Sequence, residues 1–113
     1  MVSLDLARNF ALSFDHVLEG SHRDVVSFKV KSKIFMTMNA KENRICIRLS
    51  PIDQSVFAAF DASVIYPVPN AWGKYGWTLI NLKKVKKEML KDAVTTAYCH
   101  VAPPKLAEKY QLL

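Results

Sequence analysis

The chain has 113 residues, 50% of them hydrophobic, and a formal net charge of +6. A chain of this length forms one domain and buries roughly two-thirds of its unfolded surface, so it can fold without disulfides or metals. The three glycines exclude a low-complexity chain, and the absence of an apolar run of about 18 residues excludes a membrane span. We therefore expect one soluble domain over residues 1–113.

The N-terminus and the cysteines bear on location and cofactors. Asp5, Arg8 and Asp15 interrupt the apolar residues of MVSLDLARNFALSFDHV, whereas a signal peptide needs a basic start and an unbroken apolar centre. Cys46 and Cys99 are far apart and match neither the spacing of a zinc site nor that of a redox dithiol. The sequence predicts a cytoplasmic protein without a cofactor or metal.

The first half of the chain predicts one helix and three antiparallel strands. A helix is expected from about Leu4 to Leu18, because apolar residues recur at helical spacing after Ser3, a suitable N-cap. The segment VVSFKVKSKIFMTMN then predicts a tight hairpin. RICIRLS alternates apolar and polar residues with the period of a half-buried strand.

The second half predicts two helices separated by a further strand. Ser50 and Pro51 favour the start of a short helix that ends near Phe60, with Val56, Phe57 and Phe60 supplying apolar contacts. YGWTLINL reads as a strand with Trp77 in the core, preceded by prolines that break regular structure. A long helix is expected over residues 83–100, followed by two prolines and a short helical tail.

Four stretches, SFKVKSKIF, ENRICIRLSP, YPVPNAWGKYGWTLINL and AYCHVAPPKLAEKY, resemble the MmcQ/YjbR family over nearly the whole chain. The resemblance implies an α+β two-layer sandwich, similar to frataxin-like and secretion-chaperone-like folds. An antiparallel sheet of about five strands would be covered by an N-terminal helix and a long C-terminal helix. Family members are often labelled DNA-binding through a double-wing arrangement, and the resemblance transfers no catalytic residue. Ser32 stands where the family commonly has a turn glycine, and lysines replace acidic residues at the start of the long helix.

Lysines are concentrated at the expected start of this helix. Lys83, Lys84, Lys86 and Lys87 would occupy its first turn, where the helix dipole disfavours each cation by a few tenths of a kcal/mol. A bound phosphate would reverse that cost. Lys84, Lys87 and Lys91 would form an outward stripe, with Lys86 turned toward the apolar side. The competing interpretation is a solvated helix face without a ligand.

Aromatic residues beside Lys74 provide a second candidate for binding. Trp72, Tyr75 and Trp77 could stack on exposed bases; burial is the competing interpretation and is favoured for Trp77, whereas accessible and buried placements of Trp72 both remain open. The GKYG segment lacks the first glycine and the GK[ST] ending of a phosphate-binding P-loop. His22 and Asp24 are the only pair to consider for catalysis, and an exposed turn explains them better.

The sequence thus predicts a non-enzymatic protein that binds DNA or another polyanion through the basic helix edge and the adjacent hairpin. The expected nucleic-acid-binding residues are Lys29, Lys31, Arg48, Trp72, Lys74, Lys83, Lys84, Lys87 and Lys91. The alternative is a protein-interaction module, or a homodimer resembling secretion chaperones, that does not bind nucleic acid. An enzyme acting on a small ligand is the third interpretation.

Overall fold

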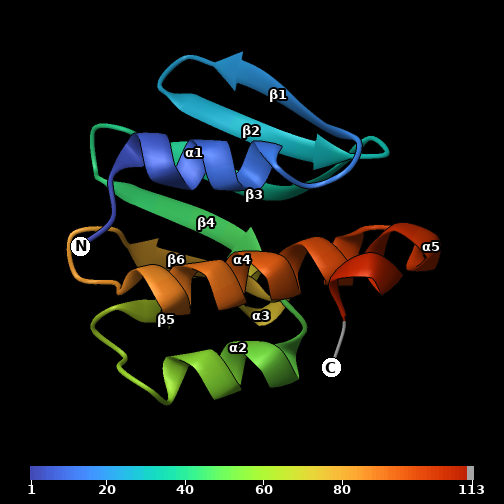
Figure 1. The fold of residues 1–113 in the computed structure, drawn as a ribbon. Coiled ribbons are helices and arrows are strands. Elements are labelled where there is room, and N and C mark those ends of the chain that lie inside the picture. Colours follow the sequence, from blue (N-terminus) through green and yellow to red (C-terminus); the bar gives the residue numbers. More distant parts are fainter. Residues whose placement is uncertain (112–113) are drawn as a thin grey trace.

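The structure, a computed structural model, describes residues 1–111 and is built around a six-stranded antiparallel sheet (Figure 1). The strand order is β1-β2-β3-β4-β6-β5. The strands are β1 (Val17–His22), β2 (Val25–Val30), β3 (Lys33–Asn39), β4 (Arg44–Arg48), β5 (Ile65–Pro67) and β6 (Trp77–Asn81). The helices are α1 (Leu4–Leu12), α2 (Pro51–Ala58), α3 (Ala71–Lys74), α4 (Lys87–Val101) and α5 (Pro104–Ala107), with a final 3-10 turn, η1 (Glu108–Tyr110). The predicted α+β class is confirmed, with six strands instead of about five.

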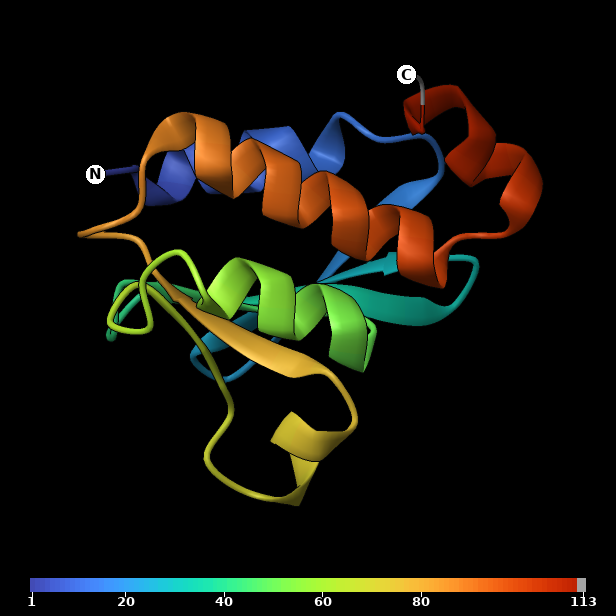
Figure 2. The same cartoon turned by 90° about the horizontal axis from the view of Figure 1, so that it is seen from below.

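Helices α1 and α4 cover the same side of the sheet, while the β5–β6 connection with α3 projects away from them (Figure 2). The core lies between the sheet and the layer formed by α1 and α4. Its fully buried side chains include Phe28, Phe35, Ile45, Ile47, Ile80, Leu90, Val94 and Tyr98. Helix α2 packs beside β5, and the buried Gln54 amide ties it to α3 by donating to Gly73 O (3.0 Å) and to β6 by donating to Thr78 Oγ1 (3.0 Å). No helix among residues 1–111 is long and apolar enough to cross a membrane.

The β2–β3 hairpin is as tight as the sequence predicts. Lys31 and Ser32 form its turn with φ values of 49° and 68°, so both adopt the left-handed conformation of a two-residue hairpin turn. Ser32 therefore takes this conformation without the glycine that the family commonly places there. Three residues beyond the turn, a register shift makes Phe35 an extra residue of β3, and Phe35 and Met36 are both fully buried.

The first helix is shorter than expected. It ends at Leu12 instead of Leu18, and the Ser13 N–H donates to Phe10 O at 3.1 Å. His16 then adopts a φ of 64°, which an α-helix cannot accommodate. Val17 and Leu18 consequently belong to β1, an edge strand that the sequence did not predict.

The long helix begins four residues later than expected, at Lys87 instead of Lys83. The Asn81 side chain accepts the Lys83 N–H at 3.0 Å, and Asn81 O accepts the N–H groups of Lys84 and Val85. These bonds form a turn that leads to Lys86, whose extended backbone makes it the N-cap. Only Lys87 lies in the first helical turn, and Lys86 is exposed instead of turned toward the core. The prediction of a lysine-loaded first turn is wrong.

Candidate nucleic-acid interface

Neither of the longest helices, α1 and α4, lies on the opposite face of the sheet, where only the short helix α3 projects at the β5–β6 side (Figure 2). Phe28 and Ile47 are buried in the core, so Lys29 and Arg48, the next residues of their strands, lie on the other face. Trp77 pairs with Arg48 and shares that face. We call this surface the open face; its side chains include Leu18, Lys29, Ile34, Thr37, Arg44, Cys46, Arg48, Tyr66, Trp77, Leu79 and Asn81. No Asp or Glu of the six strands points to it.

One end of the open face is hollowed. A cavity of about 540 Å³ is lined by Lys29, Ser32, Lys33, Ile34, Arg48, Trp77, His100 and Val101, and we call it the basic hollow. Its walls come from the β2–β3 hairpin, the ends of β4 and β6, and the last turn of α4. None of the lining residues is acidic.

The cations of the basic hollow lack carboxylate partners among residues 1–111. The ion pairs of this part of the chain use other basic residues: Arg8 with Glu19, Lys41 with Asp24, Arg44 with Glu42 and Lys109 with Asp15. The carboxyl end of α4 adds about half a negative elementary charge at one wall. Lys29, Lys33 and Arg48 outweigh it with a full positive charge each, so the hollow favours anions.

The structure separates the predicted binding residues into two groups. Lys29 and Arg48 meet in the basic hollow, and Lys31 lines an adjoining pocket with Lys33 and His100. Lys83, Lys84 and Lys87 lie near the opposite end of α4, and its 15 residues correspond to about 22 Å. The helix edge and the hairpin therefore do not form one continuous basic surface.

The predicted lysine stripe along α4 is broken. The Lys91 ammonium lies 5.5 Å from the ring centroid of Phe10, so this side chain packs against α1. Lys84 lines a cleft with Asp61. Hydrogen bonds from Ser63 lower the pKa of Asp61, and the charge of Lys84 lowers it further. Of Lys84, Lys87 and Lys91, only Lys87 has neither an aromatic ring nor a carboxylate beside it among the residues described.

The aromatic residues of the predicted site differ in exposure. Trp72 and Tyr75 are 62% and 65% exposed. Of the two placements left open for Trp72, the structure therefore shows the accessible one, in α3 with Lys74. Trp77 is half-buried on the open face, with the Arg48 guanidinium 5.5 Å from its ring centroid. Its predicted place in the core is wrong, because Thr78 and Ile80 fill the inward positions of β6.

Sequence reasoning missed Lys33 and His100 as members of the basic hollow. Lys33 is the first residue of β3, directly after the hairpin turn, so the run Lys29, Lys31, Lys33 was the available signal. His100 comes from the last turn of α4, some 70 residues away in sequence, and only the fold brings it to the hairpin.

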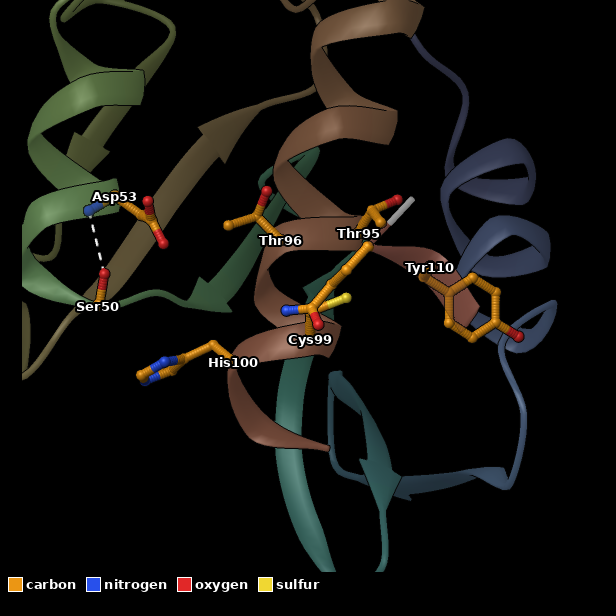
Figure 3. Close-up of a pocket in the computed structure, with 8 residues that line it drawn as sticks. Ser50, Asp53, Thr95, Thr96, Cys99, His100 and Tyr110 are labelled. Carbon is orange, nitrogen blue, oxygen red and sulfur yellow. Dashed lines mark hydrogen bonds between the residues drawn. The ribbon is translucent and has the colours of Figure 1, made fainter. Parts of the chain in front are cut away.

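A second groove, between α2 and α4, contains Asp53, Cys99 and His100 (Figure 3). Figure 3 shows the cysteine and histidine side chains projecting in different directions, as expected for neighbours on a helix. Burial raises the pKa of the Cys99 thiol, and this thiol donates to Ala107 O at 3.7 Å. Burial also raises the pKa of Cys46 to about 11. Neither thiol has the lowered pKa of a reactive cysteine, and residues 1–111 contain no cluster of three potential metal ligands.

The architecture is that of a small two-layer α+β domain with one uncovered sheet face. The YjbR family model matches residues 12–100, and the chain belongs to the YjbR family. Its fold is similar to the crystal structure of the Deinococcus radiodurans protein DR2400, which contains a DUF419 domain. The TM-score is 0.79 at 19% sequence identity, covering 100% of this chain and 91% of that chain. No curated protein matches the chain.

Proposed function

We propose that this protein binds nucleic acid, without catalysing a reaction, through the basic hollow and the adjoining open face. The observation that carries the proposal is the convergence of Lys29, Lys33 and Arg48 with Trp77 in one cavity that no carboxylate lines. Lysine and arginine contacts to phosphate supply most of the affinity of such proteins, and an aromatic ring beside them contacts bases. This location replaces the helix edge, whose lysines are dispersed.

Three phosphate contacts set the expected salt dependence. Because each contact releases counterions, log K for a duplex falls with log[salt] at a slope of about −0.9 per phosphate. Binding by Lys29, Lys33 and Arg48 should therefore weaken roughly 40-fold when salt rises from about 50 to 200 mM. An apolar protein interface would tolerate this change.

Reversing two charges of the hollow tests the proposal. In the Lys29→Glu/Arg48→Glu variant, affinity should fall more than about 100-fold, because two phosphate contacts become repulsions. Fluorescence anisotropy with labelled single strands and duplexes of about 20 nucleotides measures the effect.

The matched control is Lys84→Glu/Lys87→Glu, which changes the net charge equally at the other end of α4 and should weaken binding only modestly. Equal losses in both variants would show that net charge, and not the hollow, drives binding. Absence of binding by the unmodified protein at low salt would refute the proposed function.

A specific observation also favours the alternative of a homodimer. Val56 and Phe60 were expected to supply apolar contacts, yet they are 52% and 69% exposed, so this expectation is wrong; Ile52, four residues before Val56, is 75% exposed. Ile52 and Val56 lie four residues apart on α2, and Phe60, in the turn that follows, continues this spacing into a mostly apolar cleft of about 290 Å³ beside Met89. Two such stripes crossing about a twofold axis would cover each other.

The size of this stripe sets the expected strength of the dimer. A helix of 8 residues is about 12 Å long, so the interface falls below the roughly 1,200 Å² of a stable complex. We expect a weak dimer, detectable by sedimentation only at high concentration. Val56→Lys should abolish it, whereas Ser55→Lys, an exposed neighbour outside the stripe, should not. A protein that stays monomeric at every concentration would exclude this candidate.

A further inference from the structure

The open face has two aromatic side chains on its last two strands. Tyr66 of β5 pairs directly with Leu79 of β6, and Trp77 lies two residues before Leu79 on the same side. Tyr66 and Trp77 are therefore diagonal neighbours on either side of Leu79, and the Cα atoms of such a pair are about 7–8 Å apart. Leu79 is only 7% exposed although no helix covers it, whereas Tyr66 and Trp77 are half-buried. Neighbouring side chains thus cover Leu79, and the accessible apolar surface of this strip is that of the two rings.

The charges around this strip favour an anionic ligand. Arg48 lies beside Trp77, and Lys29 continues the positive charge toward the hairpin. Arg44, at the other end of β4, is paired with Glu42 at 2.7 Å. A second copy of the chain placed face to face would bring Arg48 and Lys29 close to identical charges, which disfavours a dimer through this face.

The geometry of the face favours unpaired bases over a duplex. In a duplex the flat faces of the bases are stacked on one another, so a protein reaches phosphates and groove edges only. Rings that lie on a sheet can instead stack with bases of a single strand, as in other sheet-based binding domains. Helices α1 and α4, the longest of the molecule, lie behind the sheet and cannot enter a groove from this face (Figure 2).

We infer that the open face is a platform for single-stranded nucleic acid. Phosphates bind Lys29 and Arg48 at the basic hollow, and two bases stack on Trp77 and Tyr66 along the strip beside Leu79. The inference rests on the proposed function and adds to it the class of ligand and the path of the strand toward β5.

Removing one ring tests the platform. Tyr66→Ala should weaken binding of a labelled oligothymidylate by about five- to 150-fold, the range that corresponds to one base–aromatic stack, and leave duplex binding nearly unchanged. Tyr66→Phe keeps a ring and should bind as the unmodified protein does. Phe60→Ala removes an exposed ring from the turn after α2, outside the open face, and is the matched control with no expected effect.

A second measurement avoids reliance on variants that fail to fold. Photocrosslinking of the unmodified protein to an oligonucleotide containing 5-iodouracil, mapped by mass spectrometry, should label Tyr66 or Trp77. Labelling confined to Trp72 and Tyr75 would overturn the platform.

Two further results separate the platform from the proposed function. Equal affinity for duplex and single strand, with loss only in Lys29→Glu/Arg48→Glu, would leave phosphate binding intact and refute the platform. Failure to bind either form at low salt would refute the proposed function itself.

Discussion

Replacing Tyr98 by Ala should lower the free energy of unfolding by about 3–5 kcal/mol, because a fully buried ring is lost from the centre of the core. The Tyr98 ring stacks on Phe14 with centroids 4.5 Å apart and meets Phe35 and Tyr110 edge to face. It therefore joins α4 to the segment after α1, to β3 and to η1. Few single changes should affect so many elements at once.

The matched variant Tyr98→Phe isolates the hydroxyl group. This hydroxyl donates to Asp15 O at 2.7 Å, and burial is the main cause that raises the pKa of Tyr98 to about 12, so it stays protonated at neutral pH. Loss of the bond should cost about 1–2 kcal/mol. Urea denaturation measures both variants. A Tyr98→Ala protein as stable as Tyr98→Phe would contradict the central packing role of the ring.

The middle strands could be predicted because one face of each is buried. In β4 the buried Ile45 and Ile47 alternate with the more exposed Arg44, Cys46 and Arg48, which produces the period of two that the sequence shows. Strand β1 has no such pattern, since all of its residues except the half-buried Val17 are exposed. Its apolar Val17 and Leu18 instead continue the helical spacing of α1. His16, which lies between α1 and β1, has a left-handed backbone that the sequence does not reveal.

The start of α4 differs from the prediction because the lysine pattern does not reveal the turn that Asn81 forms before the helix. Asn81 favours a local turn by bonding the backbone two residues ahead, and its side chain does so at Lys83. The backbone carbonyl of Asn81 accepts two further N–H groups, those of Lys84 and Val85. Lys83, Lys84 and Lys86 thus lie outside the helix. Their unfavourable interaction with the helix dipole, which the predicted helix start implied, is therefore absent.

Part of the candidate site could be predicted, and the remainder depended on the layers of the fold. Alternation correctly separates Trp77 and Leu79 from Thr78 and Ile80, but it cannot tell which side the helices will cover. Hydrophobicity favours Trp77 as the inward residue. The structure places Thr78 inside, where its hydroxyl donates to Gly76 O and accepts from Gln54. Because these bonds satisfy the buried Thr78 hydroxyl, Thr78 can occupy the inward position, and Trp77 lies on the opposite face beside Arg48.

Substitution of Gly76 by Ala should destabilise the protein by about 2–5 kcal/mol, and it should also disturb the candidate site. Gly76 has a φ of +100°, and an added Cβ would lie 1.8 Å from Leu49 O. The backbone would have to shift, and the bond from the Leu49 N–H to Gly76 O, now 3.0 Å, would be strained or lost. Because this bond joins the ends of β4 and β6, the shift would separate Arg48 from Trp77.

Gly20→Ala, in β1, is the matched control for the same change at another position. A Cβ at Gly20 would meet only Ser27 Oγ, at 3.5 Å, and needs no backbone movement. We expect its free energy of unfolding to stay within about 0.5 kcal/mol of that of the unmodified protein. Thermal and urea denaturation measure stability, and the tryptophan emission of the folded variants reports the surroundings of Trp72 and Trp77, which lie on either side of Gly76 in the chain. If Gly76→Ala were as stable as Gly20→Ala and kept the same emission, the close approach of Gly76 to Leu49 would not be what holds Arg48 beside Trp77.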